Sequence, residues 1–202
     1  MKPVNVEQNS PEWHRIRCGV PTASEFSNLI TSTGKPSASL KPYVCQIAAN
    51  QFYGEPIDTF DGNRWTERGH ELEPQARAYY EFMHAPVETI GFCLTDDESA
   101  GCSPDGLVGD DGMLQIKCLS AKHHVKTMAM EAAPSDYFIQ TQGEMFVTGR
   151  KWNDLLFFHP ELPPFVRRVE ADEEFQGKLA EQIKVANEEI NRLVAMLKAE
   201  AA

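Results

Sequence analysis

Residues 101–118 read GCSPDGLVGDDGMLQIKC. Two runs of strand-forming residues, 101–108 and 113–119, flank the turn sequence Gly109-Asp110-Asp111-Gly112. An Asp-Gly pair between two apolar runs is a strong short-range signal for a hairpin. The stretch therefore predicts two antiparallel strands joined by a short turn.

The second strand of this hairpin sorts its side chains by the two-residue period of a strand. Gln115 and Lys117 project to one side, and the hairpin brings Asp105 beside them. The other, buried side is made by Leu114, Ile116 and Cys118. An acid, an oxygen-bearing side chain and a lysine at one end of a sheet would form a Mg²⁺ site with a proton-handling group next to it. The alternative is a surface hairpin with the aspartate at a turn and the lysine in solvent.

The residues around the hairpin predict further helices and strands. Helices are expected from about residue 22 to 30 and over 42–53, 64–83 and 137–147, strands over 87–94 and 152–159, and a proline-rich turn over 160–164. The clearest helix spans about 173–199, where apolar residues from Phe175 to Leu197 repeat at intervals of three and four. This order indicates an α+β or mixed α/β fold with a central sheet, in a single domain of residues 1–202.

Composition excludes several classes of protein. The chain has 202 residues, 42% of them hydrophobic and 24% charged, which excludes a disordered or low-complexity protein. Its five cysteines show no C-x-x-C spacing, and no run of about 18 apolar residues occurs. We therefore expect reduced thiols in a cytoplasmic protein that is neither secreted nor bound to a membrane.

The formal net charge of −11 is unevenly distributed along the chain. Residues 55–111 contain fourteen acids and three bases, so this segment carries the entire excess and the remainder is neutral. Such acidity argues against a sequence-independent phosphate-binding protein, although it is compatible with a divalent-metal site beside a DNA channel. A solvated acidic face is the simpler alternative.

An anion pocket is predicted near residue 22. Thr22-Ala23-Ser24-Glu25 fits a capping box, so a helix should begin near Thr22. Its first backbone N–H groups, the hydroxyl of Ser24 and the guanidinium of Arg17 together could hold a phosphate. The alternative is an ordinary helix cap with Arg17 in a surface ion pair.

Other candidate residues have simpler interpretations. His123 and His124 are neighbours whose side chains diverge on a helix or strand, so a surface pair is expected rather than a metal pair. Trp13 and Trp152 are expected to be packing residues rather than platforms on which bases stack.

Four segments together carry a family resemblance. They are Trp13-His14-x-x-Arg17-x-Gly19-Val20-x-Thr22-Ala23-Ser24-Glu25, Gly69-x-x-x-Glu73-x-x-Ala76-Arg77, the hairpin of residues 103–118, and Tyr137-x-x-Gln140-x-Gln142. In this order and spacing they resemble the alkaline exonucleases of the phage lambda type, the YqaJ-like viral recombinases of the PD-(D/E)xK nuclease superfamily. The resemblance covers about residues 10 to 160. It implies an α/β fold in which helices flank a mixed central sheet with a restriction-endonuclease-like core.

The resemblance also implies a two-metal site for Mg²⁺, with Mn²⁺ able to replace it. Asp105 would be the central ligand, Gln115 stands where the family usually has Glu, and the carbonyl of Ile116 would complete the first site. Glu73 would bind a second ion from its helix. The ions would stabilise the charge that develops on the phosphate and on the leaving oxygen.

Further roles follow from the same resemblance. Lys117, with help from Gln140, would position and deprotonate the attacking water. Arg17 and Ser24 would hold the 5′-terminal phosphate and so set the polarity of digestion. The implied activity is 5′-to-3′ digestion of double-stranded DNA ends without ATP, which leaves 3′ single-stranded tails for phage-type recombination. The implied partners are DNA ends, a single-strand annealing protein, and two further copies of the chain in a ring-shaped homotrimer.

Position 115 departs from the family pattern. An amide oxygen can ligate Mg²⁺, but the replaced carboxylate removes one negative charge from the site, so metal affinity should fall. Glu73 and the acidic segment could compensate for this loss. Two alternatives therefore stay open: a catalytically impaired module that binds DNA ends, and an endonuclease of the same superfamily.

Overall fold

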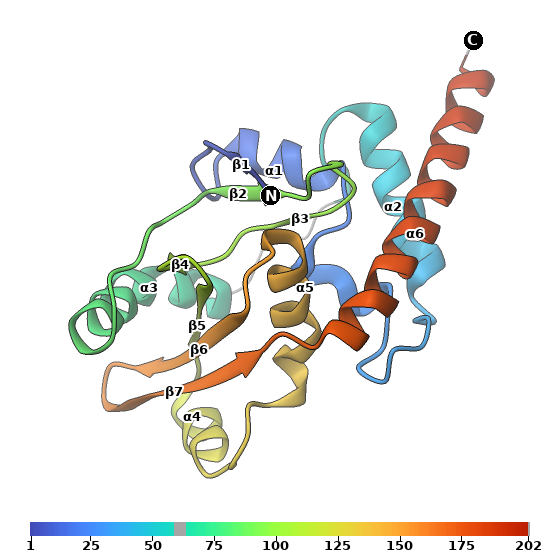
Figure 1. The fold of residues 1–202 in the computed structure, drawn as a ribbon. Coiled ribbons are helices and arrows are strands. Elements are labelled where there is room, and N and C mark those ends of the chain that lie inside the picture. The colour runs from blue at the N-terminus through green and yellow to red at the C-terminus, as the bar shows by residue number, and fades with distance from the viewer. Residues whose placement is uncertain (59–63, 202) are drawn as a thin grey trace.

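The computed structural model describes residues 1–58 and 64–201. The elements follow in the order β1 (Lys2–Val4), α1 (Pro11–Cys18), η1 (Ala23–Asn28), α2 (Leu40–Tyr53), α3 (Arg64–Met83), β2 (Phe92–Leu94), β3 (Gly101–Cys102), β4 (Gly106–Val108), β5 (Gly112–Cys118), α4 (Ala121–Met128), η2 (Ser135–Tyr137), α5 (Phe138–Thr148), β6 (Trp152–His159), β7 (Leu162–Glu170) and α6 (Glu173–Glu200), where η marks a 3₁₀ helix. Figure 1 shows α2 and α6 together at one side of the molecule, with the sheets and α3 toward the other.

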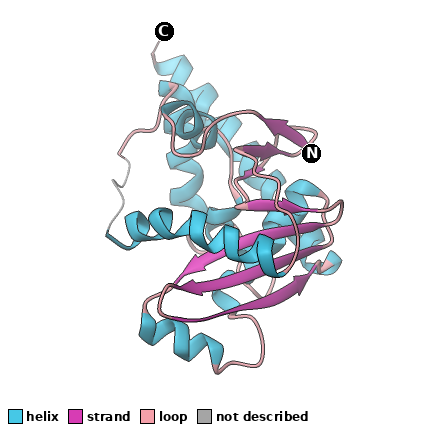
Figure 2. Cartoon of the chain, turned by 90° about the vertical axis from the view of Figure 1, so that its left-hand side faces the viewer, coloured by secondary structure: helices cyan, strands magenta, loops and turns pink. Residues whose placement is uncertain are grey.

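The central sheet has the strand order β4-β5-β6-β7. β5 and β6 run parallel and the other neighbours are antiparallel, so the expected mixed sheet flanked by helices is confirmed. α3 covers one face, and Figure 2 shows it lying across the strands. Ala76 and Tyr80 of α3 share an apolar cluster there with Leu114, Ile116 and Leu156. These strand residues are the predicted buried side of the hairpin and its continuation in β6.

The opposite face of the sheet contacts α5. Gln115 and Lys117 alternate with the apolar residues of β5, as predicted, and both make hydrogen bonds with Gln140 of α5. Met113 of β5 packs against Met145 of the same helix. Polar candidate residues therefore lie between β5 and α5, in a layer that apolar packing holds together.

Residues 101–108 form two strands, and the prediction of one continuous strand is wrong. β3 joins β2 and β1 in a second, antiparallel sheet, whereas β4 pairs with β5 in the central sheet. Pro104 lies between β3 and β4 and has no N–H to donate to a sheet. The chain changes sheets at this point, which places Asp105 at the junction.

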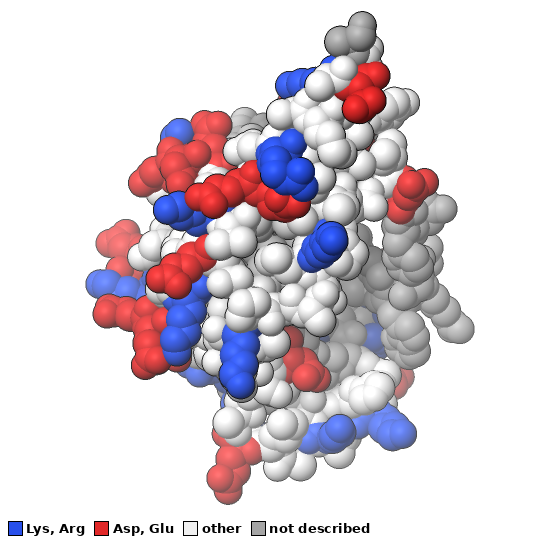
Figure 3. Space-filling view, turned by 90° about the vertical axis from the view of Figure 1, so that its right-hand side faces the viewer, with Lys and Arg blue, Asp and Glu red and all other residues white. Residues whose placement is uncertain are grey.

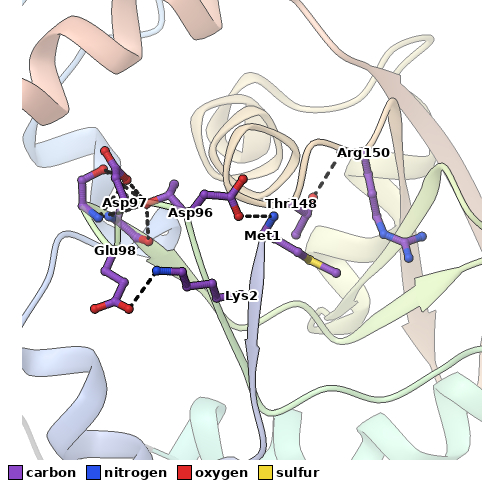
Figure 4. Close-up of polar contacts among 10 residues, drawn as sticks. Met1, Lys2, Asp96, Asp97, Glu98, Thr148 and Arg150 are labelled. Carbon is purple, nitrogen blue, oxygen red and sulfur yellow. Dashed lines mark hydrogen bonds and ion pairs between the residues drawn. The ribbon is translucent and has the colours of Figure 1, made fainter.

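Ion pairs fix β1 to the turn between β2 and β3 (Figure 4). The amino group of Met1 lies 2.9 Å from the carboxylate of Asp96, and Nζ of Lys2 lies 3.0 Å from that of Glu98. Exposed pairs of this kind contribute little free energy. Backbone pairing of β1 with β2 therefore carries most of the attachment.

Two other predictions of strand content need correction. Of residues 87–94, only Phe92–Leu94 form a strand, and Glu88 makes an isolated bridge with Leu107. The expected turn over residues 160–164 is shorter, because β7 begins at Leu162. Pro163 and Pro164 are tolerated there because β7 is an edge strand, where a missing N–H leaves no neighbouring strand unpaired.

The C-terminal helix α6 matches its predicted span of about 173–199 closely. Leu179 and Ile183 of its predicted stripe are buried against Val44 and Ile47 of α2, so the stripe packs on the chain itself. Gly54 ends α2 in the left-handed conformation, at the residue that the sequence predicted. No helix within residues 1–58 and 64–201 is long and apolar enough to cross a membrane.

Candidate active site

Asp105 lies where the chain passes from β3 to β4, with its carboxylate turned toward β5. Its Oδ2 accepts hydrogen bonds from the backbone N–H of Ile116 at 2.6 Å and from Nε2 of Gln115 at 2.5 Å. Burial, reinforced by the negative charge of Glu73, raises the pKa of Asp105 to about 7 against the opposing effect of the Ile116 N–H. A carboxyl group in this state gains from a nearby cation, which favours its ionised form.

Gln140 of α5 links the two candidate residues of β5. Its Oε1 accepts a hydrogen bond from Nζ of Lys117 at 3.1 Å, and its Nε2 donates to Oε1 of Gln115 at 3.3 Å. Nζ of Lys117 also lies 5.0 Å from the centre of the Tyr137 ring, in a cation–π contact. The structure therefore brings Gln115, Lys117 and Gln140 together beside Asp105.

Glu73 enters the site from α3. Arg77, one turn later, forms an ion pair with Glu73 and donates from Nε to the backbone carbonyl oxygen of Asp105 at 3.3 Å. The arginine thus ties α3 to the junction that carries Asp105. It also balances the charge of the Glu73 carboxylate.

The oxygen atoms gathered here have the chemistry that a hard divalent cation requires. The carboxylates of Asp105 and Glu73 and the amide oxygen of Gln115 are ligand types that Mg²⁺ takes, and a half-turn of the Gln115 amide would exchange Nε2 for Oε1. The backbone N–H of Ile116 donates a hydrogen bond to Asp105. The carbonyl oxygen of Ile116 stays a predicted metal ligand. Among the described residues, no group of three or more His, Cys, Asp or Glu side chains is placed to hold a metal ion. The carboxylates of Asp105 and Glu73 and the amide oxygen of Gln115 together fit the ligand preference of Mg²⁺.

Arg17 forms a second group of contacts with two serine hydroxyls. Its Nη2 donates to Oγ of Ser24 at 3.0 Å, and its Nη1 donates to Oγ of Ser103 at 3.3 Å. The guanidinium lies 4.2 Å from the centre of the Trp13 ring, and burial lowers the pKa of Arg17. Within the described part of the chain, no carboxylate forms an ion pair with this arginine. A half-buried guanidinium whose side-chain hydrogen bonds go to two hydroxyls is suited to binding an anion.

The helix expected from residue 22 is a short 3₁₀ helix, η1. Thr22 is extended and bridges Gly101 of β3, and its side chain makes no capping hydrogen bond. The hydroxyl of Ser24 contacts Arg17 instead of the start of a helix. A helix therefore begins where the sequence predicted, with Thr22 at its N-cap, but it is a 3₁₀ helix without the capping-box contact, and Arg17 and Ser24 lie together as expected. Phosphate binding there stays a prediction.

One cavity of about 140 Å³ joins the two groups of contacts. Its lining includes Arg17, Ser24, Ser103, Glu73, Asp105 and Gln140. An adjoining groove of about 620 Å³, walled by the N-terminal residues 5–9, shares Glu73 and Asp105 with it. An anion held by Arg17 would therefore lie in the same cavity as the candidate metal ligands.

Glu144 also lines this cavity, although none of the four family segments includes it. Its side chain is buried, and its Oε1 accepts a hydrogen bond from Nε2 of Gln140 at 2.8 Å. Burial raises the pKa of Glu144 to about 7, against the opposing charge of Lys117. The signal that could have found it is its spacing from Gln140, because residues i and i+4 share one face of a helix.

The two adjacent histidines lie on α4, outside this cavity. Their side chains diverge as predicted, but the prediction of a surface pair is wrong for His124, which is fully buried. Its Nε2 lies 2.9 Å from the carbonyl oxygen of Pro163, and its ring packs edge-on against Phe165. The sequence could not show this because β7 supplies both contacts.

Comparison with known proteins gives a match over most of the chain. The sequence profile of the YqaJ-like viral recombinase domain matches residues 12–151, a range that includes every candidate site residue. A search of curated protein sequences gives no match.

Solved structures give matches of two kinds. An alkaline exonuclease from Laribacter hongkongensis, LHK-Exo, is similar with a TM-score of 0.84 and 30% identity, covering 95% of this chain and 98% of that one. The structure of LHK-Exo in complex with dAMP gives the same values. A phage related exonuclease from Haemophilus somnus 129PT has a TM-score of 0.66 and 17% identity, covering 88% of this chain and 96% of that one, which is a likeness of fold.

Proposed function

The chain belongs to the YqaJ-like viral recombinase family, and from this premise we propose that it is a Mg²⁺-dependent exonuclease acting on the ends of double-stranded DNA. Digestion runs 5′ to 3′, needs no ATP, and leaves 3′ single-stranded tails for phage-type recombination. The 30% identity to an alkaline exonuclease over nearly the whole of both chains supports a nuclease activity. The existence of a dAMP complex of that enzyme is consistent with a site for nucleotides.

The observation that carries this proposal is the shared cavity of about 140 Å³. The guanidinium of Arg17, which forms no ion pair with any described residue, and the carboxyl groups of Glu73, Asp105 and Glu144 meet in a space that can admit a phosphate group and a cation. Either group alone has an ordinary structural explanation. Hydrolysis at a phosphorylated DNA end requires both groups. The terminal phosphate must be held by one of them while the adjacent phosphodiester bond is cleaved beside the other.

The protein side chains divide the work of hydrolysis. Lys117, whose Nζ is held by Oε1 of Gln140, orients the attacking water and accepts its proton. Arg17 and Ser24 bind the 5′-terminal phosphate and thereby select which phosphodiester lies beside Asp105. This selection gives the 5′-to-3′ polarity.

Asp105, Gln115, the carbonyl of Ile116 and Glu73 would hold the metal. When bound, Mg²⁺ supplies electrostatic stabilisation for the charge that develops on the phosphate and on the leaving oxygen. Arg77 would release part of its hold on Glu73 as that carboxylate turns to the cation. Gln115 would present its amide oxygen in place of the nitrogen that now faces Asp105.

We also propose that the chain works as a ring-shaped homotrimer around DNA, together with a single-strand annealing protein. The net charge of −11 is unfavourable for a monomer that must approach DNA. A closed ring eases this problem, because a channel can be locally basic while the outer surface carries the acids.

Digestion of end-labelled linear duplex and of closed circular duplex tests the proposal. With Mg²⁺, the linear duplex should be degraded from its 5′ ends and the circle should stay intact; with EDTA, neither should change. The Asp105→Ala variant provides the control, because it should be inactive on both substrates while remaining folded.

Two other outcomes would favour the alternatives. Cleavage of the circle would identify an endonuclease. Stable binding to linear ends without any product would identify an impaired end-binding module, which the amide at position 115 specifically favours because it removes a charged ligand.

A further inference from the structure

The side-chain amide of Gln140 has its orientation set by its partners. Its Nε2 donates to Glu144 at 2.8 Å and to Gln115 at 3.3 Å, which leaves Oε1 to accept from Lys117 at 3.1 Å. Gln115 presents its acceptor to Gln140 here because its Nε2 donates to Asp105, but a turned Gln115 amide would present a donor instead, so Gln115 alone does not fix the orientation of Gln140. Both oxygens of Glu144 act as acceptors, Oε1 from Gln140 and Oε2 from Asn153, so Glu144 requires Nε2 of Gln140 to face it.

The role of Lys117 in holding this orientation changes during the reaction. In the proposed reaction Nζ of Lys117 also contacts the attacking water, so its hydrogen bond to Oε1 of Gln140 need not stay constant. The side-chain hydrogen bonds of Glu144 go to Gln140 and Asn153, and none goes to Lys117. Glu144 is therefore the partner that can hold Gln140 throughout the proton transfer.

Glu144 is itself held rigidly. Its Oε2 accepts a hydrogen bond from Nδ2 of Asn153 at 2.8 Å. Asn153 lies near the start of strand β6, on the sheet face that also carries Gln115 and Lys117. Glu144 and Asn153 are both buried, and no Lys or Arg within the described residues forms an ion pair with Glu144. A buried carboxylate without such a partner is costly to the fold, which is a feature of functional sites.

We infer that Glu144 is a positioning residue: its carboxylate fixes the amide of Gln140, and through Gln140 it places Nζ of Lys117. The inference rests on the proposed function, in which Lys117 and Gln140 act on the attacking water. It assigns to Glu144 a structural hold on the reacting group rather than contact with DNA or metal.

Glu144→Ala and Glu144→Gln separate the hydrogen bond from the charge. The alanine variant frees Gln140 and should lower kcat by roughly 10- to 100-fold while KM stays within about 2-fold. The glutamine variant keeps an acceptor for Gln140, and a half-turn of the Asn153 amide lets its own NH₂ donate to Oδ1 of Asn153, a buried atom without a hydrogen bond to any described residue. Its kcat should stay within about 3-fold of the starting protein.

Thr148→Val is the matched control on the same helix. Its hydroxyl donates to the backbone carbonyl oxygen of Glu144 at 2.8 Å and is buried, so its loss should lower Tm without changing kcat. If Thr148→Val lowers kcat as much as Glu144→Ala does, the effect is a general weakening of α5 and the inference is overturned.

A double variant tests whether Glu144 acts through Gln140. Because the effect should pass entirely through Gln140, Glu144→Ala combined with Gln140→Ala should be no slower than Gln140→Ala alone. Additive losses would overturn the inference.

A measurement without turnover keeps this inference separate from the proposed function. The side-chain NH₂ protons of Gln140, identified in NMR spectra by their loss in Gln140→Ala, should exchange slowly with water in the starting protein and in Glu144→Gln, and rapidly in Glu144→Ala. If the starting protein digests no DNA but this pattern holds, the proposed function fails and the hold of Glu144 on Gln140 stands. Equal exchange in all three proteins would overturn the inference.

Discussion

Gln115 is the residue at which this chain departs most from a standard metal site. Its Nε2 lies 2.5 Å from Oδ2 of Asp105, so a carboxylate there would face another carboxylate at close range. Two carboxylates so placed repel each other unless a cation or a proton lies between them. The amide of Gln115 therefore stabilises the fold of the site when no metal is bound. It should also lower the affinity of the proposed site for a divalent cation.

Gln115→Glu should reverse both effects. In EDTA the substitution should lower the free energy of unfolding by about 1–3 kcal/mol, because it places a second acid beside Asp105. Mg²⁺ should restore the lost stability and raise the rate of digestion. Thermal unfolding in EDTA and in Mg²⁺ checks the first part, and the linear-duplex assay checks the second.

Gln75→Glu adds the same charge at an exposed position of α3 and serves as the control, with no metal-dependent change in Tm. If the starting chain digests nothing and Gln115→Glu digests strongly, the claim of native activity is lost. If Mg²⁺ leaves the Tm of Gln115→Glu unchanged, position 115 does not face the metal.

Arg17→Ala should abolish the preference for 5′-phosphorylated over 5′-hydroxyl ends. The guanidinium is placed to make charge-assisted hydrogen bonds worth about 1.5–3 kcal/mol, which corresponds to a loss of roughly 10- to 100-fold in the ratio of the two rates. Arg15→Ala is the matched control, because Arg15 is exposed and its ion pair with Glu55 is outside the cavity. An unchanged ratio in Arg17→Ala would remove the phosphate pocket from the account.

The positions of single site residues could be predicted where they depend only on local backbone geometry. Gln115 and Lys117 share a face because strands alternate, and the hairpin turn set their place beside Asp105. Glu144 could not be predicted, because its role depends on how α5 packs over β5. The serine at position 103 likewise gained its contact with Arg17 only from the pairing of distant segments.

Helices and strands with a regular apolar pattern had the most accurately predicted bounds. The strands that contain or follow a proline had the least accurate ones. The strand Trp152–His159 and the helices α2 and α6 have nearly the expected bounds because their apolar patterns are uninterrupted. β7 was missed because Pro163 and Pro164 are typical of turns, and only its place at the edge of the sheet makes them acceptable. The division of residues 101–108 between two sheets depends on the pairing of β3 with β2 and of β2 with β1, and β1 is far away in sequence.

The packing of α6 on α2 gives a prediction at this scale. Leu179 is 0% exposed in the cluster between these helices, so Leu179→Ala should lower the free energy of unfolding by about 2–5 kcal/mol. Val185 is 45% exposed on the same helix, and Val185→Ala should change stability by only about 0.5 kcal/mol. Urea unfolding of both variants checks the pair, and similar losses would show that α6 does not pack as described.

At the scale of the whole molecule, the placement of charge could not be predicted from the chain. Acidic and basic side chains are interspersed on the face shown in Figure 3, rather than separated into one patch of each sign. The acidic excess of residues 55–111 is a property of the sequence. In the proposed trimer, the surface that each copy turns toward the channel would decide whether these acids face the DNA.

Multi-angle light scattering at low and moderate salt tests the proposed assembly. The expected mass is three times that of the 22.7 kDa chain, with no loss of trimer on dilution across the range used for digestion. A mass of one chain under conditions where DNA is digested would contradict the ring.

In the proposed site, Glu73, Asp105 and Gln115 surround one divalent cation at the cavity that Arg17, Glu73 and Asp105 line. A crystal soaked in Mn²⁺ and measured at an anomalous-scattering wavelength would locate this cation. We expect a peak within coordination distance of Asp105 and Gln115, with Glu73 turned toward it or toward a second peak. A map without any peak among these three residues would show that they do not form a metal site.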